Sequence, residues 1–424
     1  MKENEQWKRF LKAVSIKPEE ELARTSEGQK RNRGKGEERG ERAIGDLVEK
    51  LVTKARLNQA SDIHFEPFAD CLRIRMRRDG FLQEEARLDP SLHSALLARI
   101  KILAGMDIAE HRIPQDGHFS MRIKGEKVDM RVSTVPAVFG EKTVIRLLPG
   151  KPQIDDQDTF GMGGEKAETL KEMLDGPGGL IYFTGPTGSG KTTTLYLILE
   201  YLAARPINIA TIEDPVERFL EGISQCQVNE QTGMTFETGL RALLRQDPDV
   251  IMVGETRDFE TGETSVRGAI TGHLVLSTLH TKDAASAILR LKDMGIEPYL
   301  AAAALRGVVA QRLVRKLCPL CAGEKKAEDE EKRILGEEIK IIRKPVGCQA
   351  CRYTGYQGRR AIHEVMKIDG QIREMIAEGA RAEEIREYAA GRQGMETLKE
   401  NARRLVLEGV TSLEEYKRAV YYDD

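Results

Sequence analysis

Residues 185–192 read Gly-Pro-Thr-Gly-Ser-Gly-Lys-Thr, which fits the phosphate-binding pattern G-x-x-x-x-G-K-[ST]. The apolar run 180–183 before them predicts a buried strand, and residues 192–199 after them predict a helix. Glycines let backbone N–H groups turn inward toward an anion, and a helix N-terminus adds its positive dipole end. The stretch therefore predicts a nucleoside triphosphate site, with an ordinary glycine-rich turn as the alternative.

The whole loop is expected to contact the nucleotide. Lys191 is predicted to reach the β- and γ-phosphates, and Thr192 to ligate Mg²⁺. The predicted binding residues are Gly185, Pro186, Thr187, Gly188, Ser189, Gly190, Lys191, Thr192 and Thr193.

The bulk composition is that of a globular chain of more than one domain. Its 424 residues suffice for two or three domains, and 40% hydrophobic content supports proper cores. Charged residues make up 32%, yet the net charge is only −2, which gives no general argument for nucleic acid binding. The first residues lack the apolar core of a signal peptide, and the longest apolar candidate, 299–310, is too short to span a bilayer. A soluble cytoplasmic protein is expected.

The pattern along the chain predicts an N-terminal segment and two α/β domains. Residues 1–42 are predicted to form a short helix and a flexible charged linker from residue 24, and the helix either docks a partner or folds back. Residues 43–150 combine helix and alternating-strand patterns, including a helix from Ile44 to Leu57. Residues 151–424 alternate strands with helices, which is typical of a parallel sheet. Within them, 318–360 is a cysteine-bearing insertion and 365–424 is helical by periodicity.

Acids and histidines follow predicted strands of the second domain. Glu255 ends the apolar stretch from Asp249, where a phosphate-loop enzyme places a carboxylate directed at Mg²⁺. Glu213 follows another strand and is a candidate to polarise a water, with a solvated turn as the alternative. His273 and His280 bracket a third strand; His280 is the better candidate for a γ-phosphate sensor, and His273 suits a structural role.

Four cysteines occur as two C-x₂-C pairs. Two such pairs supply the four thiolates of a tetrahedral structural Zn²⁺ site, and free thiols are the alternative. The predicted ligands are Cys318, Cys321, Cys348 and Cys351. The isolated Cys71 and Cys226 are expected in the core.

Arginines crowd one strand of the first domain. Arg73, Arg75, Arg77 and Arg78 precede the turn Asp79-Gly80. Arginine from a neighbouring domain or subunit can stabilise charge on a transferring phosphoryl group, and a polar sheet face is the alternative.

Taken together, these blocks resemble the secretion-type ATPases of type II secretion, type IV pilus assembly and DNA-uptake machines. The resemblance spans about residues 43–415 and rests on five blocks in the family's order: 61–66 (Ser-Asp-Ile-His-Phe-Glu), 185–192, 211–217, 240–258 and 271–281.

The resemblance implies a PAS-like N-terminal domain and a RecA-like core in a hexameric ring, with ATP between the lobes. Glu213 then matches the water-activating acid and Glu255 the Walker B acid, while His273 and His280 match the histidine box. Arg75 and Arg77 match the family's R-x-R-x-D-G arginines, which implies phosphate contacts.

The tetracysteine block is typical of assembly and secretion members, so the resemblance favours these over a pilus-retraction motor. It implies a partner in an inner-membrane platform protein and a place at the inner face of the cytoplasmic membrane. The usual large N-terminal module is replaced by about 42 residues, and His118 stands where arginine is expected. A RecA-like nucleic-acid motor and a nucleotide switch with negligible turnover are the remaining alternatives.

Overall fold

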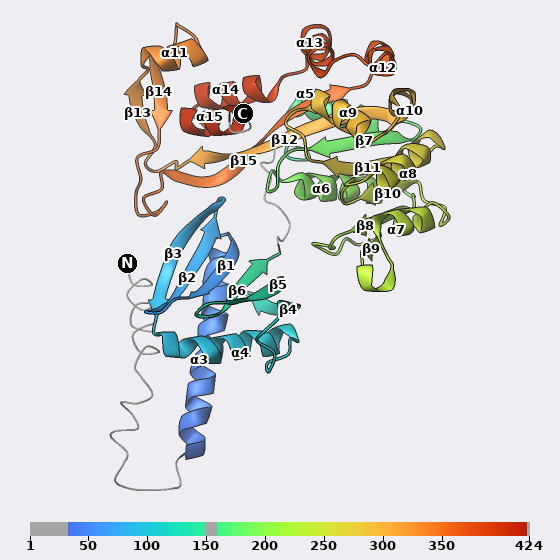
Figure 1. Ribbon diagram of the computed structural model, residues 1–424. Helices are drawn as coiled ribbons and strands as arrows, with labels where there is room; N and C mark the ends of the chain where they lie inside the picture. Colours follow the sequence, from blue (N-terminus) through green and yellow to red (C-terminus); the bar gives the residue numbers. More distant parts are fainter. Residues whose placement is uncertain (1–32, 149–158, 422–424) are drawn as a thin grey trace. The chain divides into compact units, whose positions relative to one another are not determined.

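The computed structural model describes residues 33–148 and 159–421, and the helix predicted within 1–23 lies outside them. The chain divides into two compact units, Met1–Lys151 and Pro152–Asp424, which are described separately (Figure 1).

Unit 1 begins with a long helix, α3 (Arg33–Leu57). The prediction of a flexible linker up to residue 42 is therefore wrong for residues 33–42, which are helical. Arginine, lysine and glutamate dominate this stretch and are good helix formers. Because extending an existing helix costs far less than nucleating one, the amphipathic segment from Ile44 onward propagates into them.

The sheet of unit 1 has six antiparallel strands in the order β3-β2-β1-β6-β5-β4. Asp79 and Gly80 both have positive φ, 48° and 86°, as a tight turn between β2 and β3 requires. A hydrophobic core that includes Leu47, Ile63 and Leu96 joins α3, the sheet and α4. The elements are β1 (Ala60–Pro67), β2 (Leu72–Arg78), β3 (Phe81–Leu88), α4 (His93–Ala104), β4 (Gln115–Ile123), β5 (Glu126–Ala137) and β6 (Gly140–Leu147).

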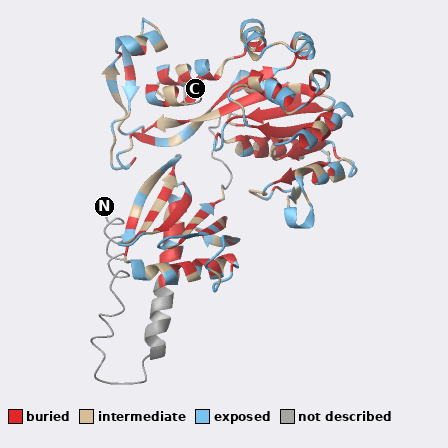
Figure 2. Ribbon diagram, in the orientation of Figure 1, coloured by how far each residue is buried: buried red, intermediate tan, exposed pale blue. Residues whose placement is uncertain are grey.

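Unit 2 is built on a seven-stranded sheet in the order β15-β12-β7-β11-β10-β8-β9. All neighbours are parallel except β12 and β15. Strands β7, β10 and β11 are buried along their whole length, as the apolar runs predict for a covered parallel sheet (Figure 2). The strands are β7 (Gly179–Thr184), β8 (Ile209–Glu213), β9 (Ser224–Gln227), β10 (Val250–Val253), β11 (Leu274–Leu279), β12 (Leu305–Leu317) and β15 (Tyr356–Lys367).

Helices precede and follow these strands, and a small two-stranded insertion separates β12 from β15. The helices near the sheet are α5 (Gly164–Leu174), α6 (Lys191–Ala203), α7 (Phe236–Leu243), α8 (Phe259–Ile270), α9 (Ala284–Asp293) and α10 (Pro298–Ala304). The insertion holds β13 (Gly323–Lys326), α11 (Asp329–Leu335) and β14 (Ile341–Lys344). The chain ends in α12 (Gly370–Ala377), α13 (Ala382–Arg392), α14 (Leu398–Leu407) and α15 (Leu413–Tyr421). Among the described helices none is both long and apolar enough to cross a bilayer.

One buried carboxylate joins the sheet to two helix starts. Glu364 of β15 accepts the backbone N–H of Ala284 at 2.9 Å and of Leu398 at 3.2 Å, so it caps both α9 and α14. Burial raises the pKa of this carboxyl group.

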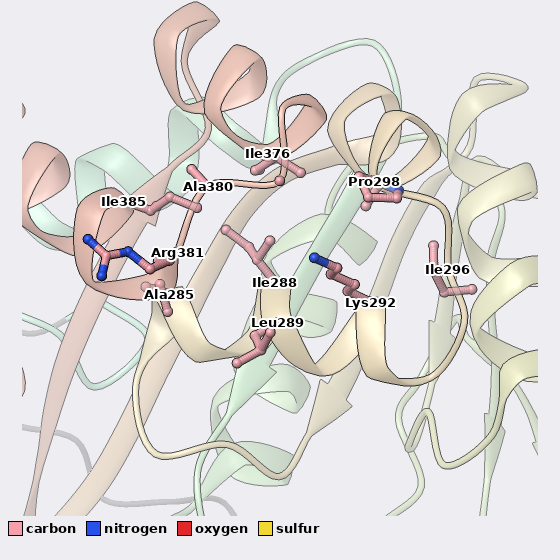
Figure 3. A pocket seen from close by; sticks show the side chains of 13 residues that line it. Ala285, Ile288, Leu289, Lys292, Ile296, Pro298, Ile376, Ala380, Arg381 and Ile385 are labelled. Atoms are coloured by element: carbon pink, nitrogen blue, oxygen red, sulfur yellow. The ribbon is translucent and has the colours of Figure 1, made fainter.

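An apolar pocket of about 120 Å³ lies between α9 and the C-terminal helices. Ile288 of α9, Ile376 of α12 and Ile385 of α13 line it (Figure 3). Its lining holds no acid, histidine or cysteine, so it marks packing between α9 and the C-terminal helices.

Replacing Glu364 with alanine removes the acceptor for two buried N–H groups. We expect Glu364→Ala to lower the free energy of unfolding by about 2–4 kcal/mol, because two buried N–H groups would be left without a hydrogen-bond acceptor. Urea unfolding followed by circular dichroism measures the change. The exposed Glu374 of α12 provides the control, and Glu374→Ala should stay near wild type. Equal stability of both variants would contradict the double cap.

Candidate functional site

The phosphate loop lies between the carboxyl end of β7 and the first turn of α6. Gly185, Gly188 and Gly190 have φ of 146°, 81° and 92°, a region that side chains disfavour. A Cβ on Gly185 would lie 2.3 Å from the carbonyl oxygen of Gln311, and one on Gly190 would lie 2.8 Å from its Nε2. A side chain at position 185 would therefore clash with the backbone of β12, and one at position 190 would displace the Gln311 amide.

Gln311 of β12 holds the loop in place. Its buried side chain donates Nε2–H to the carbonyl oxygen of Ser189 at 3.0 Å and accepts from the Thr194 hydroxyl at 2.9 Å. The Ser189 hydroxyl is itself buried and has no hydrogen-bond partner within the described residues. Sequence reasoning missed Gln311, although a lone amide inside the apolar run of β12 was a usable signal.

The Lys191 side chain points back into the phosphate loop. Its Nζ donates to the carbonyl oxygen of Gly185 at 2.6 Å and to that of Pro186 at 3.2 Å. Burial lowers the pKa of Lys191 to about 8, against a smaller opposing effect of the Glu255 carboxylate. The ammonium group is thus poorly solvated in the free protein, which makes a bound anion a favourable partner.

Glu255 and His280 meet at the same edge of the sheet. His280 Nε2 lies 3.2 Å from Glu255 Oε1, and Arg257 Nε donates to Glu255 Oε2 at 2.8 Å. Burial and the nearby charge of Lys191 lower the pKa of His280, which favours the neutral imidazole at pH 7. The structure therefore brings Lys191, Glu255 and His280 together, as parallel strands with adjoining carboxyl ends require.

Glu213 ends β8 with a buried carboxylate. Its Oε2 accepts from the Tyr196 hydroxyl at 2.5 Å, and its Oε1 accepts from Thr211 at 2.6 Å and from Gln225 at 3.0 Å. Burial and the Glu213 carboxylate raise the pKa of Tyr196, so the phenol stays a donor. Tyr196 was also missed from the sequence, because its partner lies on a different element.

His273 does not join this cluster. It precedes β11 at the amino end of the sheet, and the six residues of β11 separate it from the loop edge by about 20 Å. Its Nδ1 lies 3.0 Å from the carbonyl oxygen of Gly268 at the end of α8. Within the described part of the chain, the His273 ring contacts the end of α8 and not the phosphate loop.

The four predicted metal ligands do converge. Their sulfur atoms all lie within 4.8 Å of one another, with Cys318–Cys348 at 3.9 Å, Cys321–Cys351 at 3.7 Å and Cys348–Cys351 at 3.8 Å. Backbone N–H groups of Cys348 and Gly355 point at the Cys351 sulfur from 3.1 and 3.2 Å. Burial alone would raise the pKa of Cys351, but these N–H bonds, together with hydrogen bonds from the Cys321 and Cys348 thiols, outweigh burial and lower the pKa to about 6.

The other cysteines and the arginines lie elsewhere. Cys71 and Cys226 are both half-buried. The prediction of a core position is wrong for Cys71, which lies in the turn between β1 and β2. Cys226 packs against the hydrophobic core of unit 2. Arg75 and Arg77 lie on β2 of unit 1, where they face the carboxylates of Glu66 and Asp62.

A glycine loop with a buried lysine at the edge of a parallel sheet, beside an acid and a histidine, defines a phosphate-loop nucleotide hydrolase. Residues 37–418 match the family described as Type II/IV secretion system protein, and the chain belongs to that family.

Several relatives are similar over most of the chain. The type II secretion system protein HxcR of Pseudomonas aeruginosa is 48% identical over 372 residues, 88% of this chain and 76% of that protein. The type II secretion system ATPase E of Vibrio cholerae is 44% identical over 375 residues, covering 88% and 74%. The type IV pilus assembly ATPase PilB of Thermus thermophilus is 47% identical over 380 residues, but this chain covers only 43% of its length.

Solved structures agree with the fold. The pilus retraction motor PilT with bound ADP matches with a TM-score of 0.62 at 28% identity, covering 87% of this chain and 96% of that one. The Legionella pneumophila ATPase DotB matches with a TM-score of 0.65, and at 22% identity it bears on the fold alone. Family and site together make the chain an ATP hydrolase, which confirms the predicted family and enzyme class.

The depressed pKa of Lys191 predicts a proton linked to nucleotide binding. Phosphate oxygens beside the ammonium raise its pKa, so at pH 8.5 binding should take up a proton and affinity should fall as pH rises past 8. At pH 6.5 the lysine is already charged and contributes no uptake. Calorimetry with ADP in buffers of different ionisation enthalpy measures the protons.

The control for this experiment is Lys191→Arg, because guanidinium stays charged at every pH used. The uptake at pH 8.5 should disappear in that variant. Equal uptake in both proteins would contradict the assignment to Lys191.

Proposed function

We propose that the chain is the ATP-driven motor of a type II secretion or type IV pilus-assembly machine. It works as a homo-hexamer at the inner face of the cytoplasmic membrane and acts on an inner-membrane platform protein. The observation that carries the proposal is the meeting of Lys191, Glu255 and His280 at the sheet edge in a chain of this family. The names of the relatives in Pseudomonas aeruginosa and Thermus thermophilus support the secretion and assembly roles.

The two units correspond to a PAS-like domain, about residues 43–150, and a RecA-like ATPase domain, about 151–424. The antiparallel sheet packed with α3 and α4 supports the first assignment. The parallel sheet around the phosphate loop supports the second. ATP hydrolysis would move the two domains relative to each other, and this motion would act on the platform protein.

The loop and its neighbours divide the work on ATP. The loop 185–193 binds the phosphates through the backbone N–H groups of its residues other than Pro186 and through the Lys191 ammonium, so charge that develops during cleavage is stabilised where it forms. The exposed Thr192 hydroxyl and the Glu255 carboxylate are the hard oxygen donors that suit Mg²⁺, which when bound neutralises phosphate charge. His280, next to Glu255, is placed to respond to the γ-phosphate.

Glu213 is proposed to orient the attacking water. A carboxylate offers about four acceptor positions, and Tyr196, Thr211 and Gln225 occupy three of them. The remaining lone pair is available to a water, and the three donors fix its direction. Arg75 and Arg77 of unit 1 are proposed to contact the phosphates as well.

The cysteine cluster is proposed to hold structural zinc. Tetrahedral Zn²⁺ with Zn–S bonds of about 2.3 Å needs sulfur atoms about 3.8 Å apart, which agrees with the three separations in the cluster. Four protein ligands leave no open position, so the ion would be structural. The cluster favours assembly or secretion over retraction, although the fold resembles the retraction motor PilT.

Removing the loop lysine tests the proposed catalysis. We expect Lys191→Ala to lower steady-state ATP turnover by about 100-fold or more, because the phosphates lose their buried cation. Lys171→Ala, on the surface of α5, is the matched control and should retain wild-type turnover. The same variants, returned to the native host, should lose or keep secretion in parallel. Normal hydrolysis by Lys191→Ala would refute the site.

Metal analysis tests the cysteine cluster. Purified protein should contain about one zinc per chain, and Cys348→Ser should lose it while Cys226→Ser retains it. Chelation should lower the thermal midpoint of unfolding, because metal binding contributes to folding. Fully stable, zinc-free protein would remove the zinc proposal.

A further inference from the structure

Strand β1 buries acidic side chains on one face. Ile63 and Phe65 point into the core of unit 1, so the alternating residues Asp62, His64 and Glu66 lie on the other face. Yet Asp62 and Glu66 are only 4% and 5% exposed. A buried carboxylate needs cationic or hydrogen-bonding partners. The proposed catalysis gives no role to residues 61–66, which contain both acids.

The partners are cations of the neighbouring strands. Glu66 faces Arg75 at 2.7 Å, Arg73 at 3.2 Å and Lys142 of β6 at 3.6 Å. Burial opposes ionisation of Glu66, but the Arg75 hydrogen bond and the surrounding cations outweigh it, so its pKa is lowered.

Asp62 makes the second set of ion pairs. It lies 2.9 Å from Arg146 of β6 and 3.6 Å from Arg77, and it also accepts from the Ser61 hydroxyl at 2.7 Å. Asp62 lies opposite Arg77 and Arg146 in the strand register, so the pairs follow from the sheet itself.

Two carboxylates thus lie beneath five cations. The acidic side chains are 6–7% exposed, whereas those of Arg75 and Arg77 are 28% and 36% exposed. The five cations, Arg73, Arg75, Arg77, Lys142 and Arg146, leave a surplus of positive charge on the surface. In addition, Arg75 Nε is buried and has no hydrogen-bond partner among the described residues. Such a face suits a polyanion.

We infer that Asp62 and Glu66 are positioning residues that fix the guanidinium groups of Arg77 and Arg75 on this face of the sheet for binding of the triphosphate. An unrestrained arginine loses rotamer freedom when it binds, and a side chain already held loses less. Because the cations outnumber the acids, phosphate binding does not require the ion pairs to break. The inference rests on the proposed contact of Arg75 and Arg77 with the nucleotide.

A double-mutant cycle tests the inference. Glu66→Gln keeps the shape but removes the charge, and we expect kcat/KM for ATP to fall about tenfold, the size typical of a coupled pair. In an Arg75→Ala background the same change should have no further effect. Glu126→Gln, an exposed acid paired with Arg56, is the control and should match wild type.

The outcomes separate the inference from its premise. Wild-type activity of Arg75→Ala would overturn the proposed arginine contact. A fall in Arg75→Ala with wild-type activity in Glu66→Gln would overturn only the positioning role. Additive losses would also overturn it, because a purely structural acid acts independently of Arg75. Asp62→Asn with Arg77→Ala supplies a second cycle if Glu66→Gln does not fold.

Discussion

The site depends on the hydrogen bonds that hold the buried ammonium group of Lys191 in the phosphate loop. A cation at the start of a helix, removed from water, is stable only because carbonyl oxygens of Gly185 and Pro186 accept from it. Those carbonyls are in place because three glycines curl the loop and Gln311 fixes it against β12. The fold therefore maintains a positive centre that a triphosphate satisfies better than the protein does alone.

From this centre a chain of contacts leads to the C-terminal helices. The Thr184 hydroxyl, just before the loop, accepts the Thr281 N–H at 2.8 Å, and Thr281 donates to the carbonyl oxygen of Asp283 at 2.9 Å. Asp283 starts α9 and lies 3.4 Å from Arg386 of α13. Glu364 caps the same end of α9 together with α14. The phosphate loop is thus connected through Thr281 and Asp283 to the C-terminal helices.

Local patterns were enough to predict the loop, the buried strands β7 and β11 and the convergence of four cysteines. Each depends on residues close in sequence or on a rule of parallel sheets. The sequence patterns did not reveal the roles of Gln311, Tyr196 and Glu364. Their hydrogen-bond partners lie on other helices and strands, and one sequence alone does not show which distant residues come together. The helical residues 33–42 were missed because charge density was taken for a linker when it is also compatible with a helix.

The most direct measurement is a structure of the protein with Mg²⁺ and a non-hydrolysable ATP analogue. The account predicts β- and γ-phosphate oxygens within hydrogen-bond distance of the backbone N–H groups of 188–192, with Lys191 Nζ moved from the Gly185 carbonyl onto those oxygens. Phosphates bound elsewhere, or a lysine still on the carbonyl beside a bound analogue, would contradict it.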